Sequence, residues 1–115
     1  MAFMPLLLDV EDKKVVIFGG GSVGGRRARL FSLYSNDVTV IREPDDNKKE
    51  EWGNAKVIHH RFDESEIVSF LNGAQIAVAA TDDPHLNDRI VSECHRLGIM
   101  ANRVDMGEKD LIVPS

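Results

Sequence analysis

A glycine-dense corner between an apolar run and a helical pattern constrains this chain more than any other feature. The stretch from Lys13 to Leu30 reads KKVVIFGGGSVGGRRARL, and Gly19, Gly21 and Gly24 within it have the spacing G-x-G-x-x-G. In a dinucleotide site the first glycine permits a tight turn, the second lets the backbone approach a pyrophosphate, and the third lets helix and strand pack closely. The positive end of the following helix would face the phosphates. The corner therefore predicts a dinucleotide site, with a glycine turn that binds nothing as the alternative.

The rest of the chain alternates between short apolar runs and amphipathic patterns, which predicts alternating strands and helices. A capping-box pattern at Asp63 and Glu66 and the pair Asp83–Pro84 are typical of helix starts. Because the runs are apolar throughout and the connections are short, we expect an α/β fold with a doubly wound parallel sheet of the Rossmann type. The expected strands are Val15–Phe18, Val38–Ile41, Lys56–His59, Gln75–Ala80 and Ile99–Val104, and the expected helices cover Val23–Tyr34, Asp63 to Leu71, and Pro84–Leu97.

Two apolar segments lie outside this alternation. Met4–Val10 is predicted to be an edge strand or a flap over the core, and Leu111–Val113 a sixth strand. The length of 115 residues suits one domain, and 43% hydrophobic residues suffice for an ordinary core. We therefore expect residues 1–115 to form a single NAD(P)-binding domain.

Charge and cysteine content narrow the choice of partner and compartment. The formal net charge of −5 argues against nucleic acid or an anionic membrane as the main partner. No apolar run approaches the length of a membrane span. Cys94 is the single cysteine and has no partner for an internal disulfide, which fits a reducing compartment. These features predict a cytoplasmic protein that binds neither nucleic acid nor membrane.

In a doubly wound sheet, ligands bind beyond the carboxyl ends of the strands. Arg42 and Glu43 occupy the position, about twenty residues after the glycines, where an acidic residue often binds ribose hydroxyls. Arg42 could meet a 2′-phosphate and favour NADP, whereas Glu43 could serve NAD. A solvated pair of loop residues is an equal alternative, so the residues themselves leave the choice of cofactor open.

Two further strand ends carry polar residues. Thr81 and Asp82 are predicted to line the crevice, whereas Asp83 is better explained as a helix cap. Asp105 ends the segment ANRVD between apolar neighbours. Its carboxyl is expected to be partly desolvated, and so able to accept a proton near neutral pH or to approach a metal ion. A plain turn residue is the alternative for Asp105.

The histidines do not predict a metal site. His59 and His60 are adjacent and would face opposite sides of a strand. His85 and His95 are ten residues apart on one expected helix, and Cys94 has no second cysteine at zinc spacing. We therefore interpret these side chains as structural or surface groups and assign no metal ligand.

Four segments carry a resemblance to a known family. They are MPLLLDVEDKKVVIFGGGSVGGRRARL, RFDESEIV, AVAATDDPHLNDRI and ANRVDMGEKDLIVPS, and together they span essentially the whole chain. In order and spacing the chain resembles the siroheme synthase family, and most closely the N-terminal module that acts as precorrin-2 dehydrogenase and sirohydrochlorin ferrochelatase. The resemblance implies NAD⁺-dependent oxidation of precorrin-2 to sirohydrochlorin, followed in bifunctional members by insertion of Fe²⁺ to give siroheme.

The resemblance also implies roles for individual residues. It matches the pyrophosphate cradle to Gly19, Gly20, Gly21, Ser22, Val23 and Gly24, the adenosine ribose to Glu43 and Pro44 with Arg42 beside them, and the crevice to Thr81 and Asp82. Asp105 matches the aspartate proposed to assist proton removal in both reactions. The substrate is a polycarboxylate, which Arg26, Arg27, Asn102 and Arg103 would help to hold. Solvated surface positions are an equal alternative for the arginines.

The chain departs from the family pattern at three places. Gly24 stands where the family usually has alanine, and Arg42 replaces a small residue, which keeps NADP use open. Family members continue after the IVPS segment into a dimerisation and helical region, which this chain is expected to lack. Full-length members are expected to be homodimers.

A regulatory module is the alternative function. Nucleotide-sensing domains of the potassium-transport (RCK-like) type share the size, the glycine corner and an ATDD-like strand end, and bind NAD(H) without catalysis. Such a domain would not need Asp105. The RRARL and NRVD segments favour the enzyme.

Overall fold

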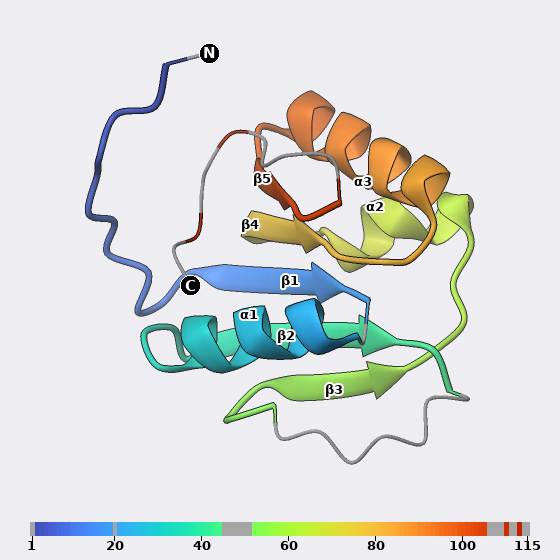
Figure 1. Cartoon of the computed structure of the whole chain (residues 1–115), viewed down its shortest axis with the longest axis horizontal. Coiled ribbons are helices and arrows are strands. Elements are labelled where there is room, and N and C mark those ends of the chain that lie inside the picture. The colour runs from blue at the N-terminus through green and yellow to red at the C-terminus, as the bar shows by residue number, and fades with distance from the viewer. Residues whose placement is uncertain (1, 20, 45–51, 106–109, 111–112, 114–115) are drawn as a thin grey trace.

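Five parallel strands form one sheet in the order β3-β2-β1-β4-β5. The computed structural model describes residues 2–19, 21–44, 52–105, 110 and 113. The elements are β1 (Lys14–Phe18), α1 (Ser22–Ser32), β2 (Asp37–Arg42), β3 (Lys56–His59), the short 3₁₀ helix η1 (Glu64–Glu66), α2 (Ile67–Phe70), β4 (Ala74–Ala79), α3 (Pro84–Leu97) and β5 (Met100–Arg103) (Figure 1). The chain runs outward from β1 to β3, then returns to place β4 on the other side of β1. This order confirms the predicted doubly wound Rossmann-type sheet.

Helices cover both faces of the sheet, which explains why its strands are apolar throughout. In β1, Val15 and Ile17 point into a cluster beneath α1, whereas Val16 and Phe18 point into a second cluster beneath α2 and α3. All four side chains are fully buried. Helix α1 packs on β1 and β2, and α3 packs on β4 and β5. The carboxyl ends of β1 and β4 therefore meet at the switch point where the strand order reverses.

Local capping fixes the ends of α3 where the sequence predicts them. The Asp83 side chain accepts hydrogen bonds from the backbone N–H groups of His85 and Leu86, at 3.0 and 3.3 Å. Pro84 occupies the first turn, and Gly98 ends the helix with φ 73°. The capping box at Asp63 is also present, although it opens the 3₁₀ turn η1 before the chain becomes α-helical.

Helix α1 begins one residue before the predicted span Val23–Tyr34 and ends two residues before its predicted end. It begins at Ser22 and ends at Ser32. Beyond it the Ser35 hydroxyl donates to the Lys13 carbonyl at 2.7 Å and accepts from the Asp37 N–H at 3.0 Å. These bonds turn the chain toward the start of β2 and stop the helix.

The N-terminal segment is not an edge strand, so that prediction for Met4–Val10 is wrong, whereas the alternative of a flap stays a prediction. The segment has no regular secondary structure, and Met4 and Leu7 are almost fully exposed. The strand that follows it, β1, is central, and β2 and β4 already occupy its two sides. The predicted strand at Leu111–Val113 lies outside the described residues except for Val113. Within the described part of the chain, no helix has the length and apolar character to cross a membrane.

Candidate active site

The glycine corner is where the ends of three strands meet. The Gly19 N–H donates to the Ile41 carbonyl of β2 at 2.8 Å, and the Ala80 N–H that follows β4 donates to the Phe18 carbonyl at 2.8 Å. Gly19 has φ 113°, and a Cβ placed on it would lie 2.2 Å from the Ala80 oxygen. No side chain fits there, so the first glycine of the motif is required by the close approach of β1 to the loop after β4.

The start of α1 has the features of an anion site. A Cβ on Gly24 would lie 2.5 Å from the Gly19 oxygen, so the helix rests directly on the turn and even alanine would force a backbone shift. Gly21 caps the helix, and a Cβ there would meet no atom within 4 Å. Among the described residues, no side chain caps this end and no acidic residue lies in the first turn. The N–H groups of Ser22 and Val23 thus have no intrahelical partner and fit a pyrophosphate. Gly20, also predicted to belong to this cradle, lies outside the described residues.

The sequence left Arg42 and Glu43 as alternatives for contacting the ribose of a cofactor, and at the end of β2 the two side chains lie in different environments. Arg42 is only 2% exposed, and its guanidinium carbon lies 4.7 Å from the centre of the Trp52 ring. Glu43 is largely exposed and accepts a hydrogen bond from Arg61 Nε at 3.0 Å. Pro44 follows it at the surface. Glu43 therefore presents its carboxylate to solvent near the glycine corner, whereas Arg42 is packed into the domain.

A buried amide fixes the loop after β4. Asn87 of α3 is fully buried; its Oδ1 accepts from the Thr81 N–H at 3.1 Å and from the Thr81 hydroxyl at 2.6 Å. Its Nδ2 donates to the Thr81 carbonyl at 3.0 Å and to Asp105 Oδ2 at 3.0 Å. Asp82 lies exposed in the same loop. Asn87 thus connects the loop after β4 to Asp105.

Sequence reasoning missed Asn87, although a signal was available. The residue lies on the same stripe of α3 as the buried Ile90, Val91 and Cys94, at helical spacing. A polar residue on an apolar stripe needs a buried partner, and Thr81 and Asp105 supply it here.

Replacing Asn87 by alanine should destabilise the fold by about 2 kcal/mol or more, because it removes a fully buried amide and its four hydrogen bonds to Thr81 and Asp105. Denaturant unfolding followed by circular dichroism measures this change. Asn72→Ala is the matched control, because Asn72 is exposed and its hydrogen bonds are made by backbone: its carbonyl accepts from Lys14 Nζ at 2.7 Å and its N–H donates to the Ser69 carbonyl at 3.3 Å. Equal stability of the two variants would show that the Asn87 network contributes little.

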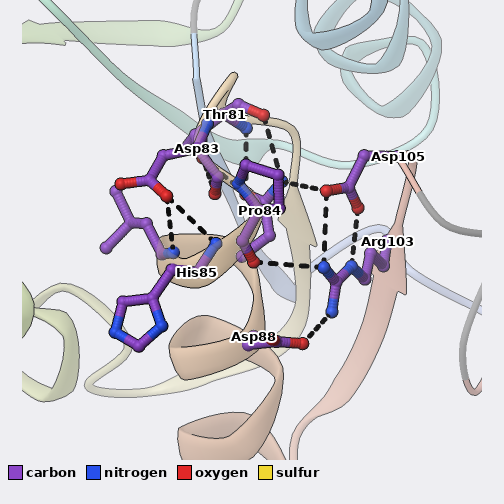
Figure 2. A network of polar contacts seen from close by, with 9 residues as sticks. Thr81, Asp83, Pro84, His85, Asp88, Arg103 and Asp105 are labelled. Atoms are coloured by element: carbon purple, nitrogen blue, oxygen red, sulfur yellow. Dashed lines mark hydrogen bonds and ion pairs between the residues drawn. The ribbon is translucent and has the colours of Figure 1, made fainter.

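Asp105 lies just beyond the end of β5, and two residues donate hydrogen bonds to its carboxylate. Arg103 Nε donates to Oδ1 at 2.6 Å (Figure 2). Asn87 Nδ2 donates to Oδ2 at 3.0 Å, and Arg103 Nη2 lies 3.4 Å from the same oxygen. The side chain of Asp105 is 22% exposed, so one part of the carboxylate remains open to solvent. Asp105 follows β5 and the glycine corner follows β1, so both lie beyond the C-terminal ends of the parallel strands.

The charge state of Asp105 differs from the sequence-based expectation. Partial burial does raise the pKa of this carboxyl, but the hydrogen bond from Arg103 is the larger effect and holds the pKa below its ordinary value. Asp105 is therefore ionised at neutral pH, rather than poised to titrate there. The pairing could have been found in the sequence, because residues two apart in an extended chain point to the same side.

The four predicted substrate-holding residues do not share one surface. Arg26 is exposed on α1. Arg27, Asn102 and Arg103 are buried, and Arg27 Nε donates to Asn102 Oδ1 at 3.3 Å. The structure corrects the prediction for these three, because their polar groups are directed at partners inside the domain. Of the four, only Arg26 is exposed.

Three histidines pair with carboxylates near the surface. His60 contacts Glu66 at 2.7 Å, His85 contacts Glu64 at 3.0 Å, and His95 contacts Asp110 at 2.9 Å; these are ring-nitrogen-to-oxygen distances. In the part of the chain that the structure describes, no three histidine, cysteine or acidic side chains come together as a metal site.

Comparisons with known proteins agree with this geometry. Residues 6–115 match the family of putative NAD(P)-binding domains. The chain is 34% identical over 119 residues to the precorrin-2 dehydrogenase of Methanosarcina barkeri, covering 98% of the chain and 52% of that protein. It is 36% identical over 105 residues to the siroheme synthase of Ectopseudomonas mendocina, covering 91% of the chain and 22% of that protein.

Solved structures show the same fold. The precorrin-2 dehydrogenase SirC superposes with a TM-score of 0.72 at 23% identity, over 98% of this chain and 55% of SirC. A Rex-family repressor superposes with a TM-score of 0.56 at 18% identity, over 90% of this chain and 49% of that one. The predicted resemblance to precorrin-2 dehydrogenases and siroheme synthases is confirmed. The chain spans about half the length of the Methanosarcina relative and about a fifth of the length of the Ectopseudomonas relative. By the match over residues 6–115, the chain belongs to the family of putative NAD(P)-binding domains.

Proposed function

We propose that this chain catalyses the NAD⁺-dependent oxidation of precorrin-2 to sirohydrochlorin, as a single NAD(P)-binding domain. The observation that carries the proposal is that an ionised carboxylate, Asp105, lies at the same sheet edge as the glycine corner. Asn87 connects this carboxylate to Thr81 at the crevice rim. The names of the Methanosarcina relative and of SirC support the same reaction. The cytoplasm is the proposed compartment, in keeping with the free thiol of Cys94.

The reaction removes a hydride and a proton from the tetrapyrrole, and NAD⁺ would supply the hydride acceptor when it is bound. The N–H groups at the start of α1 would hold its pyrophosphate. Asp105, ionised in the resting protein, would stabilise the positive charge left on the substrate when the hydride departs. The same carboxylate then takes a proton from the substrate and releases it to solvent. Arg26 would meet a carboxylate at the substrate's edge.

The direct test is turnover of precorrin-2 by the purified protein in the presence of NAD⁺. Sirohydrochlorin and NADH should form in equal amounts, and both are followed by absorbance. Binding of NAD(H) by calorimetry without any formation of sirohydrochlorin would overturn the proposal. That outcome is the one expected of a regulatory nucleotide-sensing module.

We expect NAD⁺ to bind more tightly than NADP⁺, because the exposed carboxylate of Glu43 would repel a 2′-phosphate while accepting ribose hydroxyls. Replacing Glu43 by glutamine should reduce the preference for NAD⁺ by about tenfold, equivalent to about 1.4 kcal/mol. Calorimetric titration with both nucleotides measures the change. Glu11→Gln should leave the preference for NAD⁺ intact, because Glu11 precedes β1 and so lies at the amino ends of the strands, away from the glycine corner. An unchanged preference in Glu43→Gln would reject the role of Glu43 in contacting the ribose.

Two finer features extend the proposal. Insertion of Fe²⁺ into sirohydrochlorin must displace two N–H protons, and the ionised Asp105 is a suitable acceptor for each in turn. Asp105→Ala should then lose iron insertion as well as oxidation.

A homodimer is proposed because apolar side chains are exposed around the amino ends of the strands. They belong to Met4, Leu6, Leu7, Leu33 and Tyr34. Analytical ultracentrifugation would reject the dimer if the protein sediments as a monomer at micromolar concentration.

A further inference from the structure

Arg103 is almost completely buried, yet all three nitrogens of its guanidinium have hydrogen-bond acceptors. It is 4% exposed, and its guanidinium contacts acceptors on two elements. On one side Nε and Nη2 meet the Asp105 carboxylate at 2.6 and 3.4 Å. On the other side Nη1 pairs with the Asp88 carboxylate, and Nη2 donates to the Pro84 carbonyl at 3.1 Å. Figure 2 shows Arg103 lying between Asp105 and the first turns of α3.

This arrangement fixes Asp105 to the helix rather than to the strand alone. Pro84 and Asp88 belong to the first turns of α3, which the Asp83 cap holds in place. A guanidinium is a rigid planar fork, so anchoring it to Asp88 and Pro84 also fixes the direction from which it approaches Asp105. Asn87, also on α3, holds the second carboxylate oxygen. The carboxylate therefore has little rotational freedom.

The charges around Asp105 favour its ionised form. Among the described residues, β5 contributes the cation Arg103, and α3 contributes the anion Asp88 and the neutral amide of Asn87. The loop after β4 adds the neutral hydroxyl of Thr81 and the exposed Asp82. Asp88 is 67% exposed and well screened by water, whereas Arg103 is buried in direct contact with Asp105. The desolvated cation in direct contact with Asp105 outweighs the solvated anion, which contacts Arg103 on its other side.

We propose that Arg103 is a positioning residue that holds the Asp105 carboxylate in one orientation and in its charged form. The proposal rests on the proposed function of Asp105, and it adds a second residue on which that function depends. Arg103 acts through Asp105 and does not touch the substrate, because its guanidinium is enclosed by protein. Its removal leaves the carboxylate free to rotate and easier to protonate. The activity of the protein should then fall at mildly acidic pH first.

The first test measures the titration of Asp105 without any need for turnover. Carboxyl-carbon NMR of the whole protein should show Asp105 titrating below 3.8 in the wild type. In Arg103→Gln it should titrate higher by about one pH unit or more, as expected when an adjacent opposite charge is lost. Arg96→Gln is the matched control, because exposed Arg96 pairs with Glu93 on the far part of α3. An unchanged Asp105 titration in folded Arg103→Gln overturns the proposal, and so does a wild-type value at or above 3.8.

The second test uses turnover and two further variants. The acid limb of kcat/KM should move upward in pH in Arg103→Gln and return part-way in Arg103→Lys, which keeps the charge but not the fork. Asp88→Ala, a change at an exposed side chain, should lower kcat by about tenfold with little change in KM, because it removes one of the two groups that anchor Arg103 to α3. Unchanged acid limbs in the arginine variants, or an unchanged kcat in Asp88→Ala, count against positioning. If the NMR shift is present but precorrin-2 is not oxidised, the proposed function fails while the positioning role stands.

Discussion

Replacing Asp105 by asparagine should lower the rate of precorrin-2 oxidation by about 10²-fold or more, the usual contribution of a positioned proton acceptor. Asparagine has the shape of aspartate but neither its charge nor its affinity for a proton. NAD⁺ binding should change little, because the glycine corner lies on other elements. The measurement is kcat with saturating NAD⁺, together with the calorimetric Kd for NAD⁺.

Asp12→Asn is the control for this experiment, because exposed Asp12 lies in the turn before β1, at the far end of the strands. It makes the same chemical change and should retain wild-type kcat. If Asp105→Asn oxidised precorrin-2 as fast as this control, Asp105 would have no role in proton removal.

The same residue links stability to pH. Since the pKa of Asp105 is lowered in the folded protein, its ion pair with Arg103 stabilises the fold fully above the ordinary value of 3.8. That stabilisation is lost as the pH falls through the lowered pKa. Asp105→Asn should therefore be less stable than wild type at pH 7, and the difference should shrink toward pH 2.

Replacing Gly19 by alanine should destabilise the protein by about 3 kcal/mol or more, because the methyl group collides with backbone and φ is unfavourable. The Cβ would lie 2.2 Å from the Ala80 oxygen and 2.8 Å from the Thr81 nitrogen, and φ is 113°. NAD⁺ affinity should fall with it, because the Thr81 loop forms one wall of the crevice. Thermal unfolding and calorimetry measure the two effects.

Gly21→Ala separates stability from binding. Its Cβ would meet no protein atom within 4 Å, and φ is −77°, which alanine adopts readily. This variant should keep wild-type stability and still lose about tenfold or more in NAD⁺ affinity, since the methyl group occupies the place where backbone approaches phosphate. Wild-type affinity in Gly21→Ala would show that the pyrophosphate binds elsewhere.

Local signals explain which parts of the fold the sequence predicted well. The limits of α3 follow from Asp83, Pro84 and Gly98, all of which act within a few residues of the helix end. The central strands were recognisable because both of their faces are buried. Met4–Val10 was misread because its apolar composition says nothing of which strands lie at the edges of the sheet. That information depends on the strand order, with β3 and β5 outermost.

The candidate site was harder to predict because it depends on contacts between distant segments. The position of Asp105 beyond β5 was recognisable, but its charge state depends on Arg103 and Asn87 together. Arg103 was assigned to the substrate because a sequence shows a cation without showing its burial. Its partner Asp88 lies fifteen residues earlier, on another element. Only the tertiary fold brings the two into contact.

The exposed apolar segment at the N-terminus has a consequence for how the molecule can associate. Residues Met4 to Leu8 precede β1, so they lie at the amino end of the strands, while the glycine corner and Asp105 lie at the carboxyl end. The domain thus has an apolar end and an opposite end that carries the candidate site, and the length of the strands separates the two. A partner that covers the apolar end would therefore leave the opposite end, with the glycine corner and Asp105, accessible.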